Sequence, residues 1–137
     1  MSNNEDISKG AVGWITFAGF MMVIGGGFAM LEGLGMLIHK TNFPGVDAVL
    51  QQHSSTWGWF HIIVGAVLFF SGFAVFSGNA LARTVGVIAA TVSALGAFTT
   101  IQLQPVWNTI IIAVDIAIIW ALTAHGRDVR KLDELDA

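Results

Sequence analysis

The stretch PVWNTIIIAVDIAIIWALTA, residues 105–124, is apolar along almost its whole length. Asp115 is the only charged residue among its 20 positions. An α-helix needs about 20 mostly apolar residues to cross the roughly 30 Å of hydrocarbon in a bilayer. Proline also suits the first turn of a helix, so the stretch is predicted to form a complete transmembrane helix that begins at Pro105.

The rest of the chain has the same character. Of its 137 residues, 55% are hydrophobic and 11% are charged, and the mean hydropathy is +0.73. A soluble domain of this size could not bury so much apolar surface. Three more segments are long and apolar enough to span a bilayer, namely 11–38, 57–77 and 81–100. We therefore predict an all-α membrane protein, folded as an antiparallel bundle of four transmembrane helices.

In this arrangement the transmembrane domain covers residues 11–125. Tails at 1–10 and 126–137 flank it, and a loop at 39–56 joins the first two helices on the outer side. That loop is predicted either as a short helix on the membrane surface or as a plain loop. Segment 11–38 is longer than the membrane is thick, so the first helix should tilt, bend at its three consecutive glycines or project.

The distribution of Lys and Arg orients the bundle, because short cytoplasmic loops are enriched in these residues. Only Lys40 falls on the outer side of the predicted topology, and the positive residues on the inner side are Lys9, Arg83, Arg127, Arg130 and Lys131. Tryptophans concentrate at membrane interfaces. Here they fall at the outer interface, as Trp57, Trp59 and Trp107, and at the inner one, as Trp14 and Trp120. Both termini are therefore expected in the cytoplasm.

Small residues are regularly spaced on two of the predicted helices. Gly58, Gly65 and Gly72 recur at every seventh position, and His61 lies on the flank of that stripe. The third helix carries two rows of small residues, one of Gly86, Ala90 and Ala94 and one of Ala89, Ser93 and Ala97. Small side chains let helices approach closely within a bilayer, where burial of apolar surface adds little stability. We interpret these rows as seams of the bundle, with self-association or docking onto another membrane protein as the competing use.

Asp115 is the ionisable residue predicted to lie deepest, about ten residues from either end of its helix. A central carboxylate raises the cost of insertion by about 3 kcal/mol, which the surrounding isoleucines offset. No Lys or Arg is expected at that depth, so the carboxyl should be protonated or strongly hydrogen-bonded, with Thr91 and Ser93 as the nearest candidate partners. The two interpretations are a clamp between helices and a proton-binding or ligand-binding group.

Three further polar residues are predicted near the outer ends of the spans: Glu32, His61 and Asn108. Glu32 and His61 could pair, and Asn108 lies seven positions from Asp115 on the same helix face. One hypothesis is a polar vestibule that opens outward and has Asp115 at its floor. The other is a closed hydrogen-bond cluster that fixes the register of the helices.

No cofactor or metal is expected. The chain has no cysteine, which excludes disulfides, thiol catalysis and cysteine-bound metals. A bis-histidine haem requires two histidines at matching depth, but only His61 is predicted well inside the membrane. A zinc site would need His39, His53, His61 and Glu32 to meet, and the outer loop would have to fold back. Neither nucleic-acid binding nor enzymatic activity is expected, since no basic face or catalytic motif is present. The weakest alternative is a membrane-embedded enzyme that uses Glu32 and His61 as an acid–base pair.

A set of short motifs covers nearly the whole chain apart from the tails and the outer loop. It consists of Gly13-Trp14, Phe17-Ala18-Gly19, Glu32-Gly33-Leu34, Thr56-Trp57-Gly58-Trp59 with His61 and Gly65, Ala82-Arg83 with Gly86, Pro105-Val106-Trp107, Asp115, and Ala121-Leu122-Thr123 followed by His125-Gly126. These motifs resemble a family of small four-helix membrane proteins common in actinobacteria. The resemblance implies this topology and a bacterial plasma membrane, and the family, being uncharacterised, implies no activity.

The leading functional prediction is a non-catalytic protein that acts through helix–helix contacts. It would serve as an oligomer, or as an accessory or scaffold subunit of a respiratory or envelope complex. The expected partners are the lipid bilayer and other membrane-protein subunits or further copies of this chain. The alternative is binding or transport of protons or a small solute through the outward-facing cluster of Asp115, Glu32 and His61.

Overall fold

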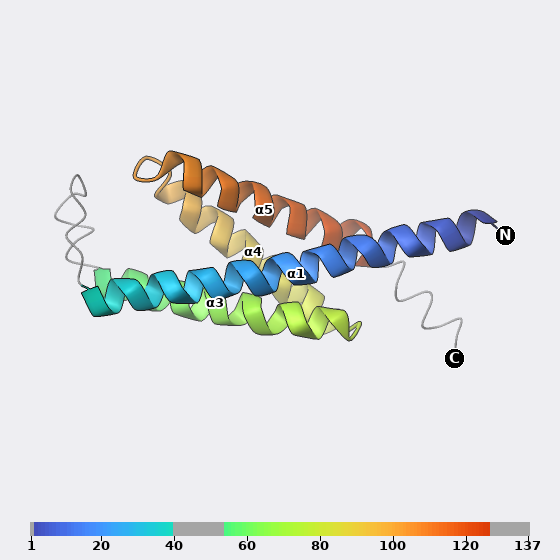
Figure 1. The fold of residues 1–137 in the computed structure, drawn as a ribbon, viewed down its shortest axis with the longest axis horizontal. Coiled ribbons are helices and arrows are strands. Elements are labelled where there is room, and N and C mark those ends of the chain that lie inside the picture. Colours follow the sequence, from blue (N-terminus) through green and yellow to red (C-terminus); the bar gives the residue numbers. More distant parts are fainter. Residues whose placement is uncertain (1, 40–53, 127–137) are drawn as a thin grey trace.

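The computed structural model describes residues 2–39 and 54–126, which form four helices (Figure 1). They are α1 (Ser2–His39), α3 (Ser54–Phe76), α4 (Ala80–Thr99) and α5 (Pro105–Ala124). Each helix is long and apolar enough to cross a bilayer, which confirms an all-helical fold with four potential spans. Residues 40–53 of the predicted outer loop (39–56), expected to be a short surface helix or a plain loop, and the tail at 127–137 lie outside the described residues.

Local chemistry fixes the turn between α3 and α4. Gly78 has a φ of 75°, a conformation that residues with a Cβ rarely adopt. Asn79 then caps α4, because its side-chain oxygen accepts hydrogen bonds from the backbone N–H groups of Leu81 and Ala82, at 2.9 and 3.4 Å. Pro105 is the first residue of α5. Backbone N–H groups at the start of a helix have no acceptor within the helix, so the N–H that proline lacks costs no hydrogen bond there. These short connections make α3, α4 and α5 successive neighbours.

The first helix is longer than the first predicted span. α1 begins at Ser2 instead of residue 11 and runs unbroken to His39, so at about 1.5 Å per residue it extends roughly 57 Å. The helix continues through the three consecutive glycines, Gly25–Gly27. Figure 1 shows the N-terminal turns of α1 reaching past the other helices. Projection therefore accommodates part of its extra length.

Glycines hold α1 and α3 together as a closely packed antiparallel pair (Figure 1). A Cβ built on Gly26 would lie 2.5 Å from the carbonyl oxygen of Gly65, and a Cβ on Gly65 would lie 2.7 Å from the carbonyl oxygen of Gly26. Gly33 and Gly58 meet in the same reciprocal way, at 2.5 and 3.0 Å. Such distances leave no room for a side chain on either helix.

A third glycine pair completes this seam. A Cβ on Gly72 would lie 2.9 Å from the carbonyl oxygen of Gly19. The three α1 glycines are seven positions apart, as are the three α3 glycines, so the pairs stay in register along antiparallel helices. Contacts that recur every seven residues keep facing the same neighbour after two turns. The predicted glycine stripe of α3 is therefore an internal seam, and its partner is the matching stripe of α1.

α4 and α5 also pair at seven-residue intervals, but through side chains. The three layers join Gly86 to Leu122, Ser93 to Asp115 and Thr100 to Asn108. We call the end of the bundle with the α3–α4 turn the inner end and the opposite end the outer end. From the inner to the outer end, the layers change from apolar contact to hydrogen bonding.

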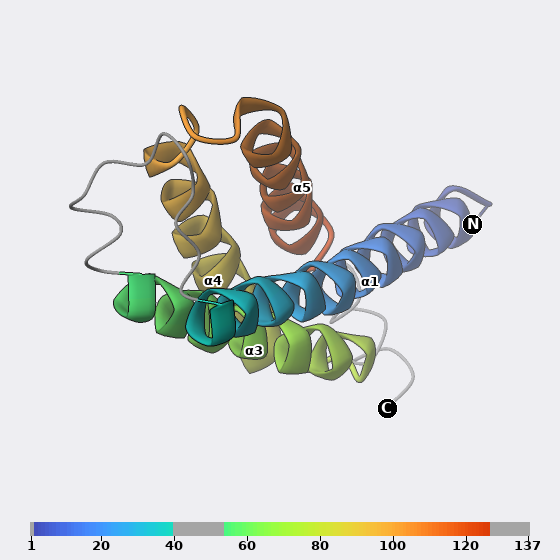
Figure 2. The same ribbon diagram turned by 60° about the vertical axis from the view of Figure 1, so that its left-hand side comes forward.

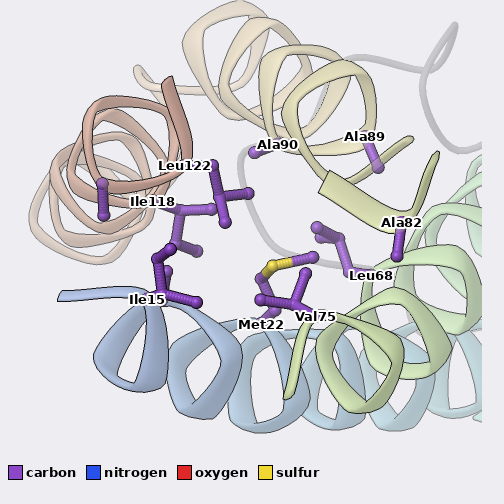
Figure 3. Close-up of a cluster of buried hydrophobic side chains, with 11 residues drawn as sticks. Ile15, Met22, Leu68, Val75, Ala82, Ala89, Ala90, Ile118 and Leu122 are labelled. Atoms are coloured by element: carbon purple, nitrogen blue, oxygen red, sulfur yellow. The ribbon is translucent and has the colours of Figure 1, made fainter. Parts of the chain in front are cut away.

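The buried core lies in the inner half, where all four helices contribute side chains (Figure 3). Met22 is fully buried there, and its Cε lies 2.5 Å from the place that a Cβ on Gly86 would occupy. The cluster consists of Ile15, Ala18, Met22, Leu68, Val75, Ala82, Ala89, Ala90, Ile118, Ala121 and Leu122. Of the predicted small-residue row on α4, Gly86 and Ala90 are buried, and Ala94 is half-buried.

Toward the outer end, the interior side of the bundle is less covered. Ala18, Gly25 and Glu32 lie seven positions apart on one stripe of α1, and they are buried, exposed and half-buried respectively. Figure 2 shows the α4–α5 hairpin diverging from the α1–α3 pair in this direction. Aromatic rings bridge the wider spacing. Phe60 Cε1 lies 3.3 Å from a Cβ built on Gly96, and the rings of Phe28 and Trp107 have centroids 6.5 Å apart.

Candidate functional site

Asp115 is buried between α4 and α5 near the middle of the α5 span, with 4% of its surface exposed. The hydroxyl of Ser93 on α4 lies close to the carboxyl group of Asp115, and Ser93 is the side chain that interacts with it. The Oδ2 atom is fully covered and has no hydrogen-bond partner among the described residues. An unsatisfied buried polar atom costs about 1–3 kcal/mol, and more when it is charged. A role as a clamp between helices therefore does not account for this oxygen.

The other hydroxyl predicted near Asp115 makes a different contact. Thr91 is exposed, and its Oγ1 donates to the carbonyl oxygen of Val87 at 2.7 Å. Three other exposed threonines donate to the carbonyl four residues earlier in the same way: Thr84, Thr109 and Thr123. A hydroxyl that bonds to its own helix can face lipid without an unsatisfied donor. Ser93 is thus the α4 hydroxyl at the candidate site.

Asn108 has a structural partner. Its Nδ2 donates to the backbone oxygen of Thr100 at 2.7 Å and to Thr100 Oγ1 at 3.2 Å. Thr100 is the C-cap of α4, where backbone carbonyls lack partners within the helix. Asn108 is itself buried, with 7% of its surface exposed. Its amide therefore ties the end of α4 to the start of α5, as in the predicted hydrogen-bond cluster that fixes register.

His61 is half-buried, and its ring is held by its own helix. The Nδ1 atom lies 3.0 Å from the carbonyl oxygen of Trp57. A carbonyl only accepts, so Nδ1 carries the proton in this contact and Nε2 of the neutral ring is an acceptor. The rings of Trp57 and Phe60 pack against His61, with centroids at 5.5 and 5.8 Å. The imidazole is thus oriented, and one nitrogen is left for a further contact.

Glu32 is half-buried on α1, within the span Lys9–Ile38. In the described part of the chain, neither a hydrogen bond nor an ion pair joins it to His61, so the predicted pair is not formed. The four predicted site residues divide between the two helix pairs. Asp115 and Asn108 lie in the α4–α5 layers, whereas Glu32 and His61 lie toward the outer end of α1 and α3.

The five tryptophans lie near the ends of the candidate spans and make several aromatic contacts. Trp14 packs edge-on against Trp120 at the inner end, with a centroid distance of 4.9 Å. At the outer end Trp57 stacks on Phe60, and Trp107 meets α1 as described above. Trp59 is exposed. All five indole rings lie near an end of a candidate span, the place where interfacial anchors are expected.

Among residues 9–38 and 55–126, whose side chains the structure describes, no three His, Asp or Glu side chains are grouped so that they could hold a metal ion. Two ligands of the hypothetical zinc site lie outside what the structure describes, namely His53 and the side chain of His39. The acceptor nitrogen of His61 and the carboxylate of Glu32 are the groups of that site that are described.

Sequence reasoning missed a polar contact at the inner end. Arg83 lies in the first turn of α4, and its Nη1 donates to the backbone oxygen of Gly126, just after α5. From the sequence, Arg83 served only to indicate which side of the membrane is cytoplasmic. The available signal was a glycine two residues beyond the last residue of α5, a place where bare backbone carbonyls attract a cation.

A family model described as a domain of unknown function (DUF7144) matches residues 14–127, which include most of α1 and all of α3, α4 and α5. No curated protein and no solved structure matches the chain.

Proposed function

Since the chain belongs to the family DUF7144, a domain of unknown function, we propose its function from the geometry of its polar residues. The protein binds and releases a proton or a small hydrogen-bonding solute at Asp115. It does so without covalent chemistry, as a multi-pass protein of the bacterial plasma membrane with both termini in the cytoplasm.

One observation carries this proposal: Asp115 is enclosed within a span, and its Oδ2 has no partner among the described residues. A residue that only clamped α4 to α5 would be expected to use both carboxyl oxygens, because buried polar atoms are normally hydrogen-bonded. Ionisable residues within spans mark proton relays and ligand sites in many membrane proteins. Ser93 suits this use, since a hydroxyl donates to a carboxylate and accepts from a carboxylic acid.

Two outer residues support access from the outer end. His61 has a ring nitrogen that acts as an acceptor, and Glu32 has a half-buried carboxylate without an ion pair in the described part of the chain. Both are half-buried toward the outer end of the bundle. A proton or solute that entered from this end would meet Glu32 and His61 before it reached Asp115.

Infrared difference spectroscopy on the protein in liposomes tests this proposal. A change of pH should produce a carboxylic-acid band that disappears in Asp115→Asn, a variant that keeps the size of the side chain and its capacity for hydrogen bonding. Glu32→Gln is the matched control, because Glu32 is the only other acidic residue in the four candidate spans. This control should keep the Asp115 band. A spectrum that is the same in wild type and in folded Asp115→Asn would contradict proton binding at this residue.

Proton flux into liposomes, read with an enclosed pH-sensitive dye, separates transport from binding. Transport predicts that flux is lost in Asp115→Asn and reduced in Glu32→Gln. Equal flux in wild type and Asp115→Asn would remove the carboxyl group from any conduction path. Folding of each variant is checked by circular dichroism in the same liposomes.

A second candidate function, an accessory subunit that docks through helix contacts, is favoured by a different observation. Gly25 is exposed and has nothing within 4 Å of an added Cβ, and Glu32 follows it by seven positions on the same stripe of α1. A helix of another subunit could pack on Gly25 and bring a cation or donor to Glu32. The α1–α3 glycine seam does not offer such a surface, because its glycines already contact each other.

Co-purification in a mild detergent at native expression tests this second function. Gly25→Leu and Glu32→Gln should both reduce recovery of the partner. Gly13→Leu is the matched control, because Gly13 is also an exposed α1 glycine with nothing within 4 Å of an added Cβ, and it lies on a different face. Wild-type protein that is a single monodisperse monomer without a partner would argue against the accessory role.

A further inference from the structure

A second polar cluster lies at the inner end, where the first turn of α4 meets the end of α5. Arg83 Nη1 donates to the backbone oxygen of Gly126. Gly126 is buried, and a Cβ on it would lie 2.6 Å from Arg83 Cζ, so the guanidinium lies directly against bare backbone. A cation at this place satisfies carbonyl groups at the C-terminal end of a helix and interacts favourably with its dipole.

Two nitrogens of this cluster have no hydrogen-bond partner among the described residues. They are Nε of Arg83 and Nδ1 of His125, and both are fully covered. In a guanidinium, Nε and Nη2 form the edge that pairs with two oxygens of a phosphate or carboxylate. Nη1 makes the bond to Gly126, so this edge is a separate donor surface, and its Nε finds no acceptor within residues 2–39 and 54–126. A charge-assisted hydrogen bond is stronger at such a covered site than in water.

Aromatic rings border the same place. The imidazole of His125 lies parallel to the indole of Trp14 within 19°, at a centroid distance of 6.3 Å. Trp120 meets the imidazole edge-on at 5.0 Å. Trp14 and Trp120 remain 42% and 48% exposed. Partly exposed tryptophans at the end of a span are typical of the headgroup level of a bilayer.

We propose that this inner cluster, formed by Arg83, His125, Trp14 and Trp120, binds the phosphate group of an anionic phospholipid. Arg83 is the fourth residue of the α4 span, and His125 directly follows the α5 span, so both lie where hydrocarbon gives way to headgroups. The guanidinium edge supplies the charge and the directed donors, and His125 Nδ1 supplies a second contact. The exposed indoles pack beside the glycerol and the first acyl carbons, as interfacial rings do.

Native mass spectrometry of the detergent-solubilised full chain tests the proposal. Phosphatidylglycerol is the probe, phosphatidylcholine is the zwitterionic comparison, and inorganic phosphate is the soluble competitor. Wild-type protein should retain phosphatidylglycerol in preference to phosphatidylcholine, and millimolar phosphate should not displace it. Arg83→Gln should weaken retention of phosphatidylglycerol about tenfold, as expected for a lost charge-assisted contact. Arg83→Lys, which keeps the charge but not the planar edge, should give an intermediate loss.

Two further variants keep the result clear if Arg83→Gln disturbs the fold. His125→Phe preserves a ring next to Trp14 but removes both nitrogens, so it should weaken retention with little loss of helicity. Lys9→Gln removes the other cation whose side chain the structure describes and should change retention less than about twofold. Equal retention of the two lipids, or unchanged retention in both Arg83→Lys and His125→Phe, would overturn the proposal. Displacement of the lipid by inorganic phosphate would assign the cluster to a soluble anion instead.

Discussion

Gly26 and Gly65 approach each other so closely that neither has room for a methyl group. An added Cβ on each would lie 2.5 or 2.7 Å from the carbonyl oxygen of the other. The opposing atoms belong to the backbone on both sides, so no rotation of a side chain can relieve the overlap. The two helices would have to separate, and the neighbouring glycine pairs would separate with them.

Gly26→Ala should therefore destabilise the bundle by about 1–3 kcal/mol, the usual cost of overpacking a tight contact. Gly25→Ala is the matched control one residue away, because its Cβ would meet nothing within 4 Å. Alanine favours a helix over glycine by roughly 1 kcal/mol, so the control should be neutral or stabilising. Unfolding titrations in mixed detergent micelles measure both. Equal stability of the two variants would contradict the seam. Gly65→Leu should disrupt it more severely.

Gly86→Ala should cost less than Gly26→Ala, although the nearest contact distance is equally short. The atom in the way is Met22 Cε, the free end of a flexible side chain, at 2.5 Å. Leucine ends one atom earlier, so Met22→Leu should relieve the crowding. The double variant Gly86→Ala/Met22→Leu should be more stable than the sum of the single changes predicts, by at least about 0.5 kcal/mol. Strict additivity in a double-mutant cycle would show that Met22 does not occupy the Gly86 notch.

Asn108→Ala should destabilise the α4–α5 hairpin by about 1–3 kcal/mol, because the carbonyl oxygen of the half-buried Thr100 loses its donor. Thr109→Ala is the control at the next position. Its exposed hydroxyl bonds only to Pro105 of the same helix, so the change should stay within about 0.5 kcal/mol. Thermal unfolding followed by circular dichroism compares the pair. A larger loss at Thr109 would assign the wrong residue to the connection.

Single cysteines should label from the predicted sides of the membrane. The chain has no cysteine of its own, so Ser2→Cys, Gln51→Cys and Ala137→Cys report without background. Intact cells treated with a membrane-impermeant maleimide should label only the variant at position 51. The two terminal variants should label after the cells are opened, because the excess of Lys and Arg predicts cytoplasmic ends. Labelling of one terminus alone in intact cells would refute the shared side.

The sequence was sufficient to predict the four apolar helices, because span length and hydropathy act within one segment at a time. The seam was half predicted: the seven-residue spacing of Gly58, Gly65 and Gly72 was recognised, but the same spacing at Gly19, Gly26 and Gly33 was not. The extra glycines near those of α1 concealed the repeat. The sequence of α1 alone does not show which of its glycines contact α3. Gly26 does, whereas a Cβ on its neighbour Gly25 would meet nothing within 4 Å.

The candidate site was less predictable, because it depends on how helices turn toward each other. The sequence placed Asp115 at mid-span and proposed Ser93 as a partner, which the packing of α4 on α5 brings together. It also proposed a pair of Glu32 and His61, and these residues are not bonded in the described part of the chain. The position of a residue within an apolar segment predicts how deep it lies in the membrane. Whether two such residues meet depends on how each helix is rotated about its own axis, which the sequence does not show.

The evenly spaced glycines of α1 and α3 also create a risk of misalignment during assembly. If α1 slid by seven residues, or about 10 Å, two of the three glycine contacts would form again with new partners. Such a shift would be opposed by the second hairpin, whose three layers differ and cannot be exchanged. Met22, seated at Gly86, links one hairpin to the other. The α4–α5 hairpin thus selects the correct alignment of α1 with α3.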